Sequence, residues 1–223
     1  MIYLLLNEKK EDILTIKGEN FKYLVKVRRH SVGDSIDIRY KENITELCHY
    51  KITDIEGRFL TLELQSSEIL EVKASKELHI GWCKIDAKSV EKMLPSLSEI
   101  GVSKISFIDC ERSQRNNKLD IKRLERIVES SMQQCGRTST IEFDSYKTIE
   151  SFIEKFPQTK VFDFTEKTLG CDADFDTVLI GCEGGFSPKE KEFLSSLEVF
   201  RLNTPLILRS ESAVFAVASK LLV

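Results

Sequence analysis

The sequence predicts an α/β protein in two parts: a small β-barrel at the N-terminus, followed by a largely parallel sheet with helices on its faces. Short stretches of alternating apolar and polar residues, separated by turn signals, fill residues 1–72. Over residues 73–223, apolar strand-like runs alternate with helix-like segments, which is the pattern of parallel strands joined by helices. A polar segment without periodicity, 71–76, lies between the two patterns and predicts a domain boundary there.

The composition fits a globular protein with enough apolar mass for a core. The chain has 223 residues, of which 41% are hydrophobic and 31% are charged, and its formal net charge is −3. This overall charge does not point to a nucleic-acid partner, so any basic surface must be local. No apolar run approaches the ~18–20 residues of a membrane-spanning helix, and the N-terminus lacks the marks of a signal peptide. We therefore expect a cytoplasmic protein without membrane contact.

The cysteines and histidines predict neither a disulfide framework nor a metal site. The six cysteines never form a C-x-x-C pair, and most lie in apolar segments, so free reduced thiols are expected. The three histidines do not have the spacing of metal ligands.

In the N-terminal part, short strands are expected near the start of the chain and at 36–40, 46–53 and 58–64. Glu56 and Gly57 are typical of a hairpin turn between the last two strands. The segment 21–29 fits either a short helix or a strand. Its closely spaced cations form either a solvated surface or a binding patch: Lys22, Lys26, Arg28 and Arg29.

In the C-terminal part, apolar residues at helical spacing predict a helix from about Val90 to Ile100 that ends at Gly101. Pro95 predicts that this helix is kinked or begins late. A second helix is expected from about Ile121 to Met132. The remaining predicted elements are strands at 78–83, 104–108, near 140–143, at 160–164, 177–181 and near 198–202, and helices near 147–155, from Pro188 and from about Ser210.

A strand that runs into a glycine-rich turn marks the predicted ligand site. The strand around Val178–Ile180 leads into three glycines, at 181, 184 and 185, and then into Ser187-Pro188-Lys189-Glu190, which predicts a capping box. Ligands of open α/β sheets bind beyond the carboxyl ends of strands. The turn matches neither G-x-G-x-x-G nor a P-loop, which argues against a dehydrogenase-like enzyme and a phosphate cradle. The apolar loop 206–208 is expected to bury against a neighbouring chain or a flat apolar ligand such as a purine.

Two segments resemble the RsmE family of 16S ribosomal RNA (uracil-N3)-methyltransferases in the SPOUT superfamily. They are Ile180–Ser187, which is similar to I-G-P-E-G-G-F-S, and Leu206–Ala213, which is similar to I-L-R-T-E-T-A. Gln134–Arg137 and Ser98–Val102 are similar to further family motifs. Cys182 stands where the family has proline, and Asn203 stands where it has glycine.

The resemblance implies a PUA-like, RNA-binding barrel over 1–72 and a SPOUT methyltransferase domain over 73–223, with a deep trefoil knot at about 160–223. It implies S-adenosylmethionine as methyl donor, N3 of uridine in 16S rRNA of the small ribosomal subunit as acceptor, and a homodimer. A non-catalytic RNA-binding protein that keeps the SPOUT fold is the alternative.

The resemblance also assigns candidate site residues. Arg209 is expected to stabilise charge on the uracil, with Glu211 or Glu183 as base or as the group that orients the arginine; at helix starts these carboxylates can also serve the helix dipole alone. The cofactor is expected to contact Thr165, Glu166, Gly181, Gly184, Gly185, Leu202, Asn203, Leu206 and Leu208, although some of these leucines can be ordinary core. RNA is expected to contact Lys22, Lys26, Arg28, Arg29, Arg112, Arg115 and Arg137.

Overall fold

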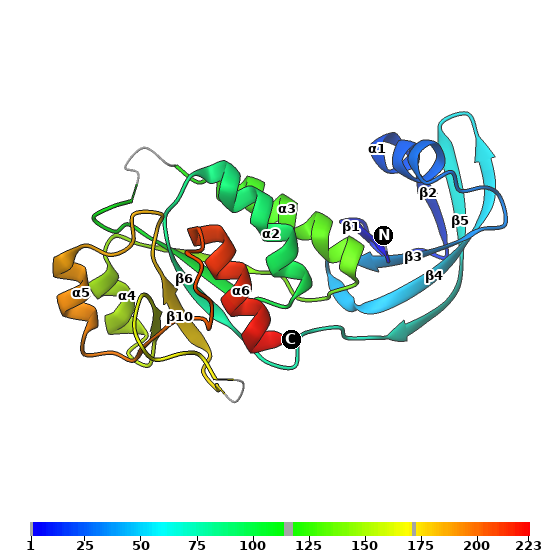
Figure 1. Ribbon diagram of the computed structural model, residues 1–223. Helices are drawn as coiled ribbons and strands as arrows, with labels where there is room; N and C mark the ends of the chain where they lie inside the picture. Colours follow the sequence, from blue (N-terminus) through cyan, green and yellow to red (C-terminus); the bar gives the residue numbers. More distant parts are fainter. Residues whose placement is uncertain (1, 114–117, 171–172) are drawn as a thin grey trace. The chain divides into compact units, whose positions relative to one another are not determined.

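The computed structural model describes residues 2–113, 118–170 and 173–223 (Figure 1). The chain divides into two compact units. The first contains the residues up to Val72 together with Met132–Thr138, and the second contains Lys73–Ser131 and Ser139–Val223. The α/β class predicted from the sequence is confirmed, because one unit is built on a mainly antiparallel sheet and the other on a parallel sheet with helices.

The first unit is a curled five-stranded sheet. Its strands are β1 (Leu4–Leu6), β2 (Ile13–Ile16), β3 (Ser35–Tyr40), β4 (Asn43–Glu56) and β5 (Phe59–Ile69), in the order β1-β3-β4-β5-β2. Only β1 and β3 pair in parallel. No ladder between β1 and β2 is found over the described residues, so the sheet is a half-barrel and not a closed barrel.

The segment that the sequence left open between helix and strand is helical. It forms α1 (Gly18–Phe21) and a π-helical segment η1 (Lys22–Val27). Phe21 and Leu24 are buried in the core of this unit, against residues of the sheet such as Ile38 and Leu60. Lys22 and Lys26 therefore stand on the helix, Arg28 and Arg29 follow its end, and the apolar positions hold the helix to the sheet.

The second unit has a six-stranded sheet in which every ladder is parallel, in the order β11-β9-β10-β6-β7-β8. The strands are β6 (His79–Cys83), β7 (Lys104–Ile108), β8 (Glu142–Tyr146), β9 (Lys160–Phe162), β10 (Thr177–Ile180) and β11 (Val199–Phe200). The helices are α2 (Ala87–Glu99), α4 (Ile149–Lys155), α5 (Pro188–Leu194), α6 (Ser210–Leu222) and α3 (Ile121–Cys135), whose last turn from Met132 belongs to the first unit. Helices α2 and α6 pack side by side (Figure 1).

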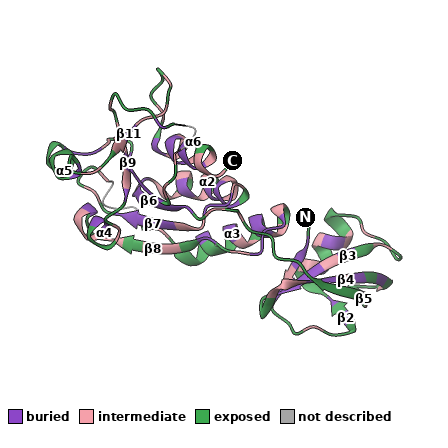
Figure 2. Ribbon diagram, turned by 90° about the horizontal axis from the view of Figure 1, so that it is seen from below, coloured by how far each residue is buried: buried purple, intermediate pink, exposed green. Residues whose placement is uncertain are grey.

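The centre of the parallel sheet forms the core of the second unit. Every residue of β6 and β10 is buried, as the colouring of β6 in Figure 2 shows. Strands covered on both faces read as continuous apolar runs, which is why both were visible in the sequence.

Helix α2 corrects one prediction. It begins at Ala87, where the Asp86 carboxylate accepts a hydrogen bond of 3.0 Å from the Ser89 amide, and it continues through Pro95. The expectation of a late start is wrong because the cap fixes the first turn eight residues before the proline. A proline in a helix removes one backbone donor, and here the helix tolerates that loss. None of the helices over the described residues is long and apolar enough to cross a membrane.

Buried His79 predicts a loss of stability in mild acid. Its Nε2 lies 2.7 Å from Ser106 Oγ, its ring contacts Phe152 and Phe156, and burial followed by the charge of Lys104 lowers its pKa from 6.5 to about 4. Between these two values the unfolded chain binds a proton that the folded chain does not, so stability falls as pH falls. We expect a loss of about 2 kcal/mol in the free energy of unfolding between about pH 7 and about pH 5.

Urea unfolding at a series of pH values measures this slope. The variant His79→Leu has no proton to bind, so its stability is expected to change less over the same range. An identical slope in both proteins would show that His79 is not the group responsible.

Candidate active site

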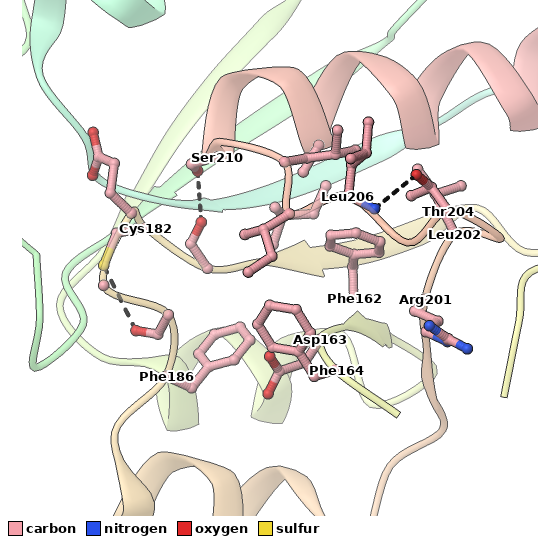
Figure 3. A pocket seen from close by; sticks show the side chains of 18 of the residues that line it. Phe162, Asp163, Phe164, Cys182, Phe186, Arg201, Leu202, Thr204, Leu206 and Ser210 are labelled. Carbon is pink, nitrogen blue, oxygen red and sulfur yellow. Dashed lines mark hydrogen bonds between the residues drawn. The ribbon is translucent and has the colours of Figure 1, made fainter. Parts of the chain in front are cut away.

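A cavity of about 370 Å³ lies where three neighbouring strands end (Figure 3). Strands β11, β9 and β10 are adjacent and parallel, so their carboxyl ends meet at one edge of the sheet. The loops that follow them supply most of the lining: Phe162, Asp163, Phe164, Ile180, Gly181, Cys182, Glu183, Gly184, Gly185, Phe186, Arg201, Leu202, Thr204, Pro205, Leu206, Ile207 and Leu208. Arg112, Lys191, Ser210 and Ala213 complete it.

Two glycines of the turn are required by the local geometry, one by its backbone conformation and one by a close contact. Gly185 closes the turn by donating from its amide to the Cys182 carbonyl over 2.9 Å, and its φ of +64° lies in the left-handed region. Gly184 lies against Arg112, whose Cβ would be 3.2 Å from an added methyl group. Because side chains are absent here, main-chain groups line this wall of the cavity.

Gly185 gives a clean test of the turn, since an added methyl group would meet nothing within 4 Å. Gly185→Ala is therefore expected to lower the free energy of unfolding by about 1–2 kcal/mol through backbone strain alone. Gly185→Asn is the matched control and should lose less, because asparagine tolerates the left-handed region better. Urea denaturation compares the two. An alanine variant as stable as the parent would show that the turn relaxes without cost.

The capping box that follows the turn is confirmed. Ser187 Oγ accepts from the Glu190 amide, and the Glu190 carboxylate accepts from the Ser187 amide over 2.7 Å. The same buried carboxylate also accepts from the Glu111 amide over 2.8 Å. One side chain thus joins the start of α5 to the loop after β7, which carries Arg112.

A second buried contact joins the turn to α6. Trp82 Nε1 donates to Ser210 Oγ over 2.9 Å, and Ser210 Oγ donates to the Gly181 carbonyl over 2.6 Å (Figure 3 shows the second bond). Trp82 is fully buried in β6. The start of α6 and the start of the glycine turn are therefore held to the centre of the sheet.

The rest of the lining is largely apolar. Phe162, Phe164 and Phe186 face the cavity from one side, and Leu206 approaches it from the loop before α6 (Figure 3). Phe164 and Leu206 are each 72% exposed and Ile207 is 81% exposed, so apolar surface surrounds the opening in the single chain. This arrangement suits a flat apolar ligand that enters between the aromatic and aliphatic walls.

The charged groups of the cavity differ in how they are paired. Asp163 forms an ion pair with Lys191 at 2.8 Å, and Arg112 Nη1 donates a hydrogen bond to the Gly184 carbonyl over 2.7 Å. Arg201 Nε is buried and has no hydrogen-bond partner within the described part of the chain. A buried donor left unpaired is costly, so Arg201 is suited to an acceptor on a ligand.

The structure brings together part of the predicted site. Glu183 and the predicted cofactor residues Gly181, Gly184, Gly185, Leu202, Leu206 and Leu208 line the cavity. Five predicted site residues are not among the described residues that line the cavity: Thr165, Glu166, Asn203, Arg209 and Glu211. Thr165 lines a smaller neighbouring cavity, and Arg209 is the exposed residue that precedes α6.

The predicted RNA-binding residues fall into three groups. Lys22, Lys26, Arg28 and Arg29 are exposed, although Lys22 forms an ion pair with Glu19 at 2.6 Å. Arg112 is exposed and lines the cavity. Arg115 lies outside the described residues. Arg137 is only 6% exposed, which does not place its guanidinium where an RNA phosphate would contact it.

Sequence reasoning did not assign Arg201, Lys191 or the three phenylalanines to the site. The ends of strands β9 and β11, at Phe162 and Phe200, could have indicated several of them, since residues next to the carboxyl ends of strands line the site of a parallel sheet. Over the described residues, no group of three or more histidine, cysteine or acidic side chains is arranged to hold a metal ion.

Comparison with known proteins places the chain in a family. The family model described as an RNA methyltransferase domain matches residues 72–222. Ribosomal RNA small subunit methyltransferase E of Helicobacter pylori is 38% identical over 216 residues, covering 94% of each chain. Ribosomal RNA small subunit methyltransferase E 2 of Borreliella burgdorferi is 27% identical, covering 91% of this chain and 87% of its own.

A solved structure shares the fold. The ribosomal RNA small subunit methyltransferase E from Neisseria gonorrhoeae, bound to S-adenosyl methionine, superposes with a TM-score of 0.76 at 18% identity and covers 98% of this chain and 95% of its own. The family model covers nearly the whole second unit, and the Helicobacter relative covers nearly the whole chain. The chain belongs to the RNA methyltransferase family that includes the ribosomal RNA small subunit methyltransferases E.

Proposed function

We propose that the protein methylates N3 of a uridine in 16S rRNA of the small ribosomal subunit, with S-adenosylmethionine as donor. The observation that carries the proposal is the cavity at the ends of β9, β10 and β11, which lies within the segment that matches the RNA methyltransferase family. Curated relatives bear the name of a small-subunit rRNA methyltransferase, and the Neisseria relative binds the same donor. We place the reaction in the cytoplasm, where such an RNA substrate occurs.

The residues of the cavity fit S-adenosylmethionine. The cavity volume of about 370 Å³ is within the range of small-molecule sites. Leu202, Leu206 and Leu208 would cover the adenine ring, and the exposed main chain of the glycine turn would approach the nucleoside. Asp163 is an acceptor for ribose hydroxyls, while Thr165 and Glu166 stand farther along the same loop. Asn203 would contribute through its backbone.

Arg201 would hold the carboxylate of the cofactor's methionine part. We expect Arg201→Gln to weaken S-adenosylmethionine binding about tenfold or more, because a hydrogen bond to a charged group is worth roughly 1.5–3 kcal/mol. The main-chain bonds of Arg201 to Lys167 and Leu169 do not depend on its side chain, so the fold should persist. Isothermal titration calorimetry measures the change, with Arg201→Lys as the variant that keeps the charge. Unchanged affinity in the glutamine variant would remove Arg201 from the binding site.

The chain's own residues must prepare the uracil. When bound, S-adenosylmethionine supplies an electrophilic methyl group. Uridine N3 is mostly protonated at neutral pH, so a base must take that proton or a cation must stabilise charge on the ring oxygens. Arg209 is our candidate for the cation. Glu183, which lines the cavity, and Glu211, in the first turn of α6, are the candidate bases.

RNA is proposed to bind through local cations on both units. The exposed set on the first unit is Lys22, Lys26, Arg28 and Arg29, and Arg112 belongs to the cavity. Such phosphate contacts make binding salt-dependent. We further propose that residues 1–72 act as a PUA-like RNA-binding domain and residues 73–223 as a SPOUT methyltransferase domain knotted at about 160–223. The exposed apolar residues around the cavity support a homodimer.

The test uses recombinant protein, radiolabelled S-adenosylmethionine and small subunits that lack the modification, followed by mapping of the labelled nucleoside. We expect 3-methyluridine in 16S rRNA. Label at another nucleoside would overturn the proposed acceptor. Protein that binds the RNA but not S-adenosylmethionine would favour the alternative, a non-catalytic RNA-binding protein with this fold.

A further inference from the structure

Three cysteines that are far apart in the sequence meet beside the glycine turn. Cys83 ends β6, Cys110 follows β7, and Cys182 follows β10. Because β6 lies between β10 and β7, the ends of these three strands are neighbours. Cys110 Sγ is 3.7 Å from Cys182 Sγ, although 72 residues separate them. The sequence predicted free thiols, but it gave no reason to expect them together.

The three thiols differ in how accessible they are. Cys83 is fully buried, Cys182 is 6% exposed and lines the cavity, and Cys110 is partly exposed. Cys110 Sγ also lies 3.0 Å from Ser113 Oγ. A reagent in solution therefore reaches Cys110 first, and Cys182 is within contact of it.

The hydrogen bonds divide the pair into a nucleophile and its partner. The pKa of the Cys110 thiol is lowered, first by its contacts with the thiols of Cys182 and Cys83 and then by its contact with the Ser113 hydroxyl. The Cys182 thiol donates to the Gly185 carbonyl over 3.7 Å, and its pKa is raised, first by its contact with Cys110 and second by burial. The thiolate is the reactive form of cysteine, so Cys110 is the sulfur that attacks and Cys182 is the thiol that follows.

We propose that Cys110 and Cys182 form an oxidation site that reacts with peroxides to give a reversible disulfide. In the first step the Cys110 sulfur attacks one peroxide oxygen, a sulfur–oxygen bond forms, the oxygen–oxygen bond breaks, and the released oxygen leaves as water. In the second step the Cys182 sulfur attacks the Cys110 sulfenic acid, the sulfur–sulfur bond forms, and the hydroxyl leaves as water with the Cys182 proton. Two thiols and one hydrogen peroxide thus give one disulfide and two waters.

The disulfide would change the shape of the cofactor wall, by which we mean the wall of the cavity that the glycine turn forms. Its sulfurs must come about 1.7 Å closer than they are now. The backbone carbonyl of Cys182 accepts the hydrogen bond from the Gly185 amide that closes the glycine turn. The loop that carries Cys110 is held by two hydrogen bonds, from the Glu111 amide to the Glu190 carboxylate and from the Arg112 guanidinium to the Gly184 carbonyl. Drawing the two loops together changes the cavity, and we expect weaker S-adenosylmethionine binding. This second part rests on the proposed function.

Peptide mapping tests the oxidation site without any need for activity. The whole protein is treated with hydrogen peroxide, alkylated, digested and analysed by mass spectrometry. We expect a Cys110–Cys182 cross-linked peptide that dithiothreitol reverses. Cys110→Ser should abolish it, and Cys135→Ser, which removes a partly exposed thiol outside the cluster, should not. Sulfinic acid at Cys110 without a cross-link, or a cross-link to Cys83, would overturn the proposal.

Calorimetry of reduced and oxidised protein tests the effect on the cofactor. We expect S-adenosylmethionine to bind at least tenfold more weakly after oxidation, to recover with dithiothreitol, and to be unaffected by peroxide in Cys110→Ser. Equal affinity in both states would refute the effect on the cofactor wall. Absence of binding in the reduced protein would instead count against the proposed function, while the mapped disulfide would stand.

Discussion

Replacing Arg209 with alanine is expected to lower the rate of methyl transfer by about 10²–10³-fold while leaving the fold intact, because it removes the cation that we propose stabilises charge on the uracil. Arg209 precedes α6 as its N-cap residue, but its side chain makes no capping hydrogen bond and is exposed. Its neighbours Leu208 and Ser210 both line the cavity. The backbone of Arg209 therefore lies between two residues that line the cavity, and its exposed side chain makes no capping bond whose loss would unfold the helix.

The control for this experiment is Arg209→Lys, which keeps the charge but loses the planar fork. We expect partial activity in the lysine variant, with unchanged urea unfolding and unchanged S-adenosylmethionine affinity in both variants. Single-turnover rates measure the transfer step. A rate near that of the parent in Arg209→Ala would exclude the guanidinium from the mechanism and leave Glu183 and Glu211 as the remaining candidates.

The sequence predicted the parallel sheet well, since its strands carry their own signal. Strands β6 and β10 are buried along their whole length and read as continuous apolar runs. The start of α5 was equally readable, because the capping box Ser187–Glu190 is a local pattern of four residues. The glycine turn and the apolar loop 206–208 were identified for the same reason.

Features that depend on distant contacts could not be predicted. The hydrogen bond between Trp82 and Ser210 spans 128 residues, and the contact between the Cys110 and Cys182 thiols spans 72 residues. No local sequence pattern marks either pair. The burial of Arg137 was also hidden, since a cation in a sequence is ordinarily read as surface. The half-barrel of the first unit has the four strands that were expected and also β2 (Ile13–Ile16), which was not expected, and whether a sheet closes depends on which edges pair.

The serine at the start of α6 does more than begin a helix. Ser210 Oγ accepts from the indole N–H of Trp82 and donates to the Gly181 carbonyl, so one buried hydroxyl satisfies a group on β6 and a group just after β10. Removing it leaves the indole N–H of Trp82, which is fully buried, without its partner, while the Gly181 carbonyl, at the wall of the cavity, loses the bond that ties it to α6. Each buried group left unsatisfied costs about 1–3 kcal/mol.

Ser210→Ala is therefore expected to lower the free energy of unfolding by about 1–3 kcal/mol, and to weaken S-adenosylmethionine binding by loosening the start of the glycine turn. Ser210→Thr keeps the hydroxyl and is the matched control, with stability and affinity close to those of the parent. Urea unfolding and calorimetry on the three proteins separate the two effects. If the alanine variant were as stable as the threonine variant, the Trp82–Ser210–Gly181 contact would not hold the turn, and the buried face of α6, which includes Ala213 and Val214, would have to position the helix by itself.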